Sequence, residues 1–138
     1  MQSLLPLLHA WQREFAGRVS FLLVYILEAH AVDEWNIGLE PELRVSQTRT
    51  LDQRQTMAQL FQRKLDVHLP IYLDSPSDNA FQQYFQAWPL RAFVVDSCAV
   101  LRWASVPTDT GHFVPSLLHD AISSFFPSEA GLEKSTVG

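Results

Sequence analysis

A run of seven apolar residues at positions 21–27 (Phe-Leu-Leu-Val-Tyr-Ile-Leu) constrains the fold of this 138-residue chain more than any other stretch. The run is rich in β-branched and aromatic side chains, and it is far shorter than the roughly 20 residues of a membrane-spanning helix. It therefore predicts a strand that is buried on both faces, as in a parallel sheet covered by helices. Glu28 and His30 follow directly. Because α/β sheets gather their chemistry at the carboxyl ends of their strands, we expect a functional site here.

Helical spacing and turn residues predict the other elements. A helix over residues 4–15 is expected, with Ser3 as its cap, Pro6 in its first turn and Gly17 at its end. The further elements expected are a helix opened by the capping-box pair Thr50 and Gln53 and ending near 68, a strand at 69–73, a short helix capped by Ser77, a hairpin of 92–95 with 100–104, and a helix from Pro115. The apolar positions expected to face inward include Leu7, Leu51, Leu117 and Phe125. The predicted order is α-β-α-β-α-β-β-α, in one α/β domain at 1–126 with a flexible tail at 127–138.

Composition excludes several classes of protein. The net charge of −5 argues against a nucleic-acid partner, which needs a basic surface. Cys98 is the only cysteine, so neither an internal disulfide nor a cysteine-rich zinc site is expected, and no metal is expected. The chain has no apolar run long enough for a transmembrane segment and no signal-peptide pattern. An intracellular, cytoplasmic location is therefore expected, with any membrane anchor upstream of Met1.

Residues 25–35, Tyr-Ile-Leu-Glu-Ala-His-Ala-Val-Asp-Glu-Trp, resemble the Y-I-x-E-A-H-x-x-D-x-W signature of iodothyronine deiodinases and their bacterial thioredoxin-like relatives. Leu27, Val32 and Glu34 stand where the family usually has Glu, Ser and Gly. The further matches, over about 4–125, are Leu51-x-x-Arg54, the strand ending in Asp74, Tyr84-x-x-x-x-Pro89-x-Arg91 and Phe113-x-Pro115. Thr48 and Leu69 replace a histidine and a cysteine found in relatives, which weakens the case for iodothyronine as substrate and favours a microbial-type homologue.

The resemblance implies a three-layer, thioredoxin-like fold of the peroxiredoxin type. That fold has one more central strand in front, which carries the selenocysteine or cysteine nucleophile just before the first helix. Met1 stands near the methionine that follows this motif, so we expect the chain to be truncated after the nucleophile, as when a UGA codon is read as a stop. The chain as given is then expected to lack redox turnover and, with two unsatisfied strand edges, to be poorly soluble.

The resemblance also implies roles for the signature residues. His30 is the expected proton donor in reductive deiodination, because an imidazole titrates near physiological pH. Glu28 would hold the ring and raise its basicity. Asp33 and Trp35 would orient the loop or form a pocket wall. An aromatic iodinated compound, as in thyroid hormone metabolism, or another small redox molecule is the expected substrate.

The same resemblance extends to the second half of the chain and to partners. Pro89 lies where this fold class keeps a cis-proline beside the redox centre, and Arg91 follows it as a pocket residue. No cofactor is expected, but an external thiol reductant is. Family members dimerise in part through the segment that corresponds to Ser20–Ile26, so a homodimer is expected there.

Two other functions stay open. The chain could be a peroxiredoxin- or thioredoxin-like thiol reductase that acts on other substrates, or a non-catalytic module that binds a partner. At the level of single residues, Glu28 and His30 could simply end a strand, and Asp33 could brace the loop backbone. Trp35 could serve packing, and Pro89 could be an ordinary turn proline. Cys98 and the remaining histidines (His9, His68, His112 and His119) are interpreted as residues without a catalytic role.

Overall fold

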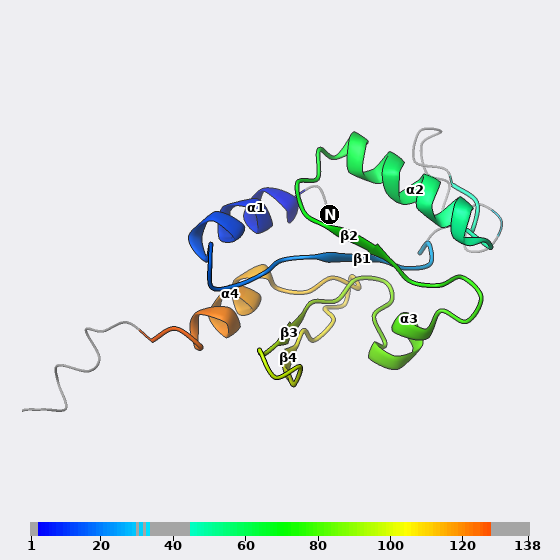
Figure 1. The fold of residues 1–138 in the computed structure, drawn as a ribbon. Coiled ribbons are helices and arrows are strands. Elements are labelled where there is room, and N and C mark those ends of the chain that lie inside the picture. The colour runs from blue at the N-terminus through cyan, green and yellow to red at the C-terminus, as the bar shows by residue number, and fades with distance from the viewer. Residues whose placement is uncertain (1–2, 30, 32, 34–44, 128–138) are drawn as a thin grey trace, which may run out of the picture. The chain divides into compact units, whose positions relative to one another are not determined.

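The computed structural model describes residues 3–29, 31, 33 and 45–127, and it has a mixed α/β composition (Figure 1). The elements are α1 (Leu5–Glu14), β1 (Leu23–Tyr25), α2 (Leu51–Lys64), β2 (Ile71–Leu73), α3 (Ala80–Phe85), β3 (Phe93–Val95), β4 (Leu101–Ala104) and α4 (Pro115–Ser123). They divide into two compact units, Met1–Pro89 and Leu90–Gly138. Of the predicted tail at 127–138, all but Pro127 lies outside the described residues. None of the helices in the described part is long and apolar enough to cross a membrane.

The first unit is built on a parallel pair of strands, β1 and β2, with Leu23 opposite Ile71 and Tyr25 opposite Leu73. α2 connects the two strands in sequence and packs against β2 (Figure 1). All three residues of β1 are only half-buried, and the side chain of Leu22 is 51% exposed. The expectation of a strand buried on both faces is therefore wrong for the described residues, in which β1 pairs with a single strand.

The first helix differs from its prediction at its start. Its N-cap is Leu4, which makes no side-chain capping bond, so the prediction of Ser3 as cap is wrong. Pro6 lies in the first turn, where its missing N–H costs little. The buried face carries Leu5 and Leu8. Leu7 is exposed, contrary to expectation, because it lies beside the buried stripe, about 100° around the helix from Leu8.

The capping box of α2 is confirmed. The Gln53 N–H donates to Thr50 Oγ1 (3.2 Å), and the Thr50 N–H donates to Gln53 Oε1 (3.2 Å). The buried positions of the helix are Arg54 and Ala58, whereas the side chain of Leu51 is 55% exposed. The inward orientation predicted for Leu51 is wrong: Leu51 is the first residue of the helix and is exposed, and the buried positions begin one turn further on, at Arg54.

The second unit contains the antiparallel pair of β3 and β4, with Phe93 opposite Ala104. The Asp96 carboxylate closes the turn between them by accepting from the N–H groups of Cys98 (2.9 Å) and Val100 (3.0 Å). α4 buries Leu118 and Ile122, one turn apart. The two positions predicted wrongly as inward are Leu117 and Phe125, and both are exposed. Leu117 is rotated away from the buried stripe, and Phe125 lies beyond the end of the helix.

Candidate active site

Two of the six predicted site residues cannot be placed. His30 and Trp35 lie outside the described residues, whereas Glu28, Asp33, Pro89 and Arg91 are described. Among these four, Glu28 and Asp33 are brought together by contacts with one residue, Gln47. Pro89 ends the first unit and Arg91 belongs to the second, so each is described by its own local contacts.

Glu28 is a half-buried carboxylate just after β1. Its Oε1 accepts a hydrogen bond from the Tyr25 hydroxyl. Burial raises the pKa of Glu28, while the bond from Tyr25 and the charge of Arg54 act against this rise. Burial, followed by the nearby Glu28 charge, raises the pKa of Tyr25, which keeps the phenol protonated as the donor. The sequence alone assigned no role to Tyr25, although the signature contains it three residues before Glu28.

Asp33 has the contacts of a residue that braces the backbone. Its Oδ1 accepts from the Gln47 N–H (2.7 Å), and its Oδ2 pairs with Arg49 Nη2 (3.2 Å). The bond from Gln47 is the main reason why the pKa of Asp33 lies below its usual value, and the Arg49 charge adds to it. Both contacts hold the carboxylate against residues 47–49, the segment that leads into α2.

Arg54 is the buried centre of this region, with a side chain that is 1% exposed. Its guanidinium donates to Thr48 Oγ1 (2.9 Å), the Asp74 carbonyl (2.8 Å) and Asn79 Oδ1 (2.9 Å), with a longer bond to the Thr48 carbonyl (3.4 Å). The arginine therefore ties the start of α2 to the end of β2 and the start of α3. Arg54 was named in the sequence as part of the motif Leu51-x-x-Arg54, but the spacing of that motif did not indicate that the arginine would be buried.

The Asp74 carboxylate completes this arrangement by accepting from the N–H groups of Phe81 (2.9 Å) and Gln82 (3.0 Å). These are donors in the first turn of α3, which have no partner within the helix. The N-cap position itself is Asn79, so the prediction that Ser77 caps this helix is wrong. The carboxylate that caps the first turn of α3 is instead that of Asp74, just after the end of β2.

A small pocket of about 190 Å³ opens at this network. The residues that line it are Leu27, Gln47, Thr48, Arg49, Arg54, Pro76 and Asn79. Two arginines and two amide side chains are suited to a polar or anionic group of a small molecule. The pocket adjoins the backbone of Glu28 through Gln47, which donates to the Glu28 carbonyl (3.1 Å).

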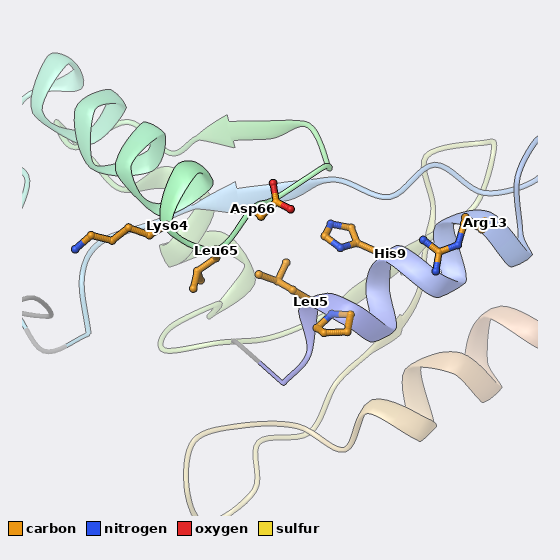
Figure 2. Close-up of a pocket in the computed structure, with 7 residues that line it drawn as sticks. Leu5, His9, Arg13, Lys64, Leu65 and Asp66 are labelled. Atoms are coloured by element: carbon orange, nitrogen blue, oxygen red, sulfur yellow. The ribbon is translucent and has the colours of Figure 1, made fainter.

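A larger pocket of about 500 Å³ lies between α1 and the end of α2 (Figure 2). Figure 2 shows His9 and Arg13 on α1 and Leu65 and Asp66 after α2. The His9 Nε2 accepts from the His68 N–H (3.1 Å), and the two imidazole rings meet edge to face with centroids 5.4 Å apart. None of the four predicted site residues that the structure describes lines this pocket.

The remaining predicted residues have local contacts. The Trp88–Pro89 peptide bond is cis, in line with what the resemblance implies for Pro89. The Arg91 guanidinium donates twice to the Ser105 carbonyl (3.0 and 2.8 Å) and lies 5.1 Å from the Phe93 ring centroid. These contacts fasten Arg91 to the strands of the second unit. Cys98 is exposed in the turn between β3 and β4.

A comparison with protein families places this geometry in context. The family model for iodothyronine deiodinase matches residues 3–107, about three quarters of the 138-residue chain. The match spans the carboxyl end of β1, the network around Arg54 and the hairpin of β3 and β4. This chain therefore belongs to the iodothyronine deiodinase family.

Proposed function

We propose that this chain supplies the acid–base residues and the scaffold of a thioredoxin-like oxidoreductase that removes iodine reductively from an aromatic ring. The observation that carries the proposal is the position of Glu28. It is a half-buried carboxylate with a raised pKa just after the carboxyl end of β1, two residues before His30 in the sequence. Such a carboxylate is suited to hold an imidazole and to support proton transfer by it.

In the proposed reaction, a selenolate or thiolate takes iodine from the ring, and the ring carbon receives a proton in its place. His30 donates this proton, and Glu28 holds the imidazole through its ring N–H. An external thiol then displaces iodide from selenium or sulfur and forms a selenenyl sulfide or mixed disulfide with it. A second thiol cleaves this bond, which regenerates the nucleophile and releases the disulfide of the two thiols. The resemblance places the nucleophile just ahead of the first helix, and the only thiol in these 138 residues is Cys98.

Three features support the finer parts of this proposal. The unit formed by β1, α2 and β2 is a parallel strand–helix–strand arrangement, which thioredoxin-like folds contain. The small pocket beside Glu28 is lined by Arg49, whose exposed guanidinium suits a phenolate or carboxylate on the substrate. Leu22 is half exposed within the segment Ser20–Ile26, which we propose as the dimer contact.

The test is iodide release from an iodothyronine, with dithiothreitol as reductant, by the protein extended through the codons that precede Met1. Replacing His30 with Asn is expected to lower kcat by about 100- to 10,000-fold, the usual contribution of a general acid. His112→Asn is the matched control, because His112 is an exposed histidine of the second unit. Turnover that survives loss of His30 would contradict its role as proton donor.

A thiol reductase is the second candidate, and the surroundings of Thr48 favour it. Thr48 stands where relatives with iodothyronine activity carry a histidine. Its hydroxyl cannot supply a proton near neutral pH as an imidazole can, and it accepts a hydrogen bond from Arg54 (2.9 Å). The same extended protein should then be assayed for hydrogen peroxide reduction. Peroxide turnover without iodide release would replace the first proposal by the second, and the absence of both would leave a non-catalytic module.

A further inference from the structure

Gln47 makes an unusual set of contacts with a segment far away in the sequence. Its side-chain Oε1 accepts from the Glu28 N–H (2.9 Å), and its Nε2 donates to the Glu28 carbonyl (3.1 Å). Its own backbone N–H donates to Asp33 Oδ1 (2.7 Å). One residue thus holds positions 28 and 33, which are 19 and 14 residues away in the sequence. We propose that Gln47 is the positioning residue that fixes the backbone of Glu28 beside the small pocket.

The chemistry of the amide explains why glutamine is suited to this position. β1 ends at Tyr25, so the strand ladder does not extend to the peptide groups of Glu28. A primary amide carries both an acceptor and a donor, and it can therefore pair with the N–H and the carbonyl of one residue at once, as a neighbouring strand would. A carboxylate lacks the donor, and an aliphatic side chain of the same length lacks both.

Gln47 is itself held in place. Its side chain is 9% exposed, and the Thr48 N–H donates to the same Oε1 (3.2 Å). Thr48 in turn accepts from the buried Arg54 through its hydroxyl (2.9 Å). Hydrogen bonds therefore connect the buried Arg54 to Thr48, Thr48 to Gln47, and Gln47 to the backbone of Glu28. A side chain fixed in this way keeps a functional group within the narrow range of geometry that chemistry needs.

The first test needs no activity, because it measures amide hydrogen exchange by NMR in the 138-residue chain. Gln47→Met keeps the volume but removes the amide, and it is expected to speed exchange of the Glu28 N–H about tenfold or more. Gln47→Glu keeps the acceptor and is expected to preserve most of this protection. The Leu23 N–H, which donates to the Pro70 carbonyl (2.9 Å), is the internal reference and should not change.

Three outcomes of this test would overturn the inference. Unchanged exchange of the Glu28 N–H in Gln47→Met would show that the amide does not hold it. Equal exchange in Gln47→Met and Gln47→Glu would show that the acceptor is not what matters. A parallel rise at Leu23 would show that Gln47 stabilises the whole unit and does not act locally on Glu28.

The second test rests on the proposed function and measures iodide release by the upstream-extended protein. Gln47→Met is expected to lower kcat by about 10- to 100-fold, because a small misplacement of a reacting group has effects of this size. KM should change by less than about threefold, because the Gln47 amide pairs with the Glu28 backbone and the substitution leaves Arg49, the charged group proposed to bind the substrate, in place. Gln55→Ala, at an exposed position on α2, is the matched control and should leave both constants unchanged.

The two tests separate failure of the inference from failure of the proposed function. If the parent protein releases iodide and Gln47→Met keeps the same kcat, the positioning role is refuted while the deiodinase proposal stands. If the parent releases no iodide, the deiodinase proposal fails, and hydrogen exchange still decides whether Gln47 holds Glu28.

Discussion

Replacing Arg54 with Met should destabilise the first unit strongly, because the substitution keeps most of the volume but removes every donor of a buried guanidinium. The bonds lost reach Thr48 Oγ1, Asn79 Oδ1 and the carbonyl oxygens of Thr48 and Asp74. Each buried acceptor left without a donor costs about 1–3 kcal/mol. Relief from burying a charge offsets part of this cost. We therefore expect a net loss of about 3 kcal/mol in the free energy of unfolding, a large share of the roughly 5–15 kcal/mol of a typical domain.

Urea unfolding followed by tryptophan fluorescence measures this loss, because Trp11 and Trp88 both belong to the first unit. Arg63→Met is the matched control, since it makes the same exchange at an exposed position of α2 and should change stability by no more than about 0.5 kcal/mol. Arg54→Lys keeps the charge without the planar set of donors and should fall between parent and Arg54→Met. A loss below about 1 kcal/mol for Arg54→Met, or one equal to that of Arg63→Met, would refute the view that Arg54 organises this unit.

Two further predictions concern α2 and Glu28. Thr50→Ala removes the hydroxyl of the capping box and should cost about 1 kcal/mol by urea unfolding, whereas Thr50→Ser should cost little; equal losses would mean that the cap bond is not the cause. Burial raises the pKa of Glu28, so its contribution to stability is fully present below the pKa of the unfolded chain and is lost as the pH rises through the higher pKa of the folded state. Glu28→Gln should therefore raise the urea midpoint at pH 7 and have little effect near pH 4, and a gain that is larger at the acidic pH would show that the sign is wrong.

Local patterns along the chain were enough to predict several features. The family signature at 25–35 led to the deiodinase family, which the family comparison confirms over residues 3–107. The capping box of Thr50 and Gln53 was predicted from two residues three positions apart, and the structure contains both of its bonds. Such features depend on the identity and spacing of neighbouring residues, and these are visible in a sequence.

Inward-facing residues were predicted less well, for a physical reason. Leu7, Leu51 and Leu117 are apolar and occur in helices, yet they are exposed. Hydrophobicity indicates that a residue can be buried, but the position of the helix on its neighbours decides which side is covered. In α2 the covered side carries Arg54, whose charge is acceptable there because surrounding oxygens accept its hydrogen bonds.

In the candidate site too, the features that neighbouring residues determine were predictable, whereas the contacts between residues far apart in the sequence were not. The signature placed Glu28 and Asp33 after the apolar run, and the family resemblance implied that Glu28 supports proton donation by His30 and that Asp33 orients the loop or forms a pocket wall. No local pattern indicated that Gln47 would hold both, or that Arg54 would link Thr48, Asp74 and Asn79. These contacts join residues 6 to 25 positions apart. They depend on how the chain returns to itself through α2 and β2, and that path is set by packing among distant residues.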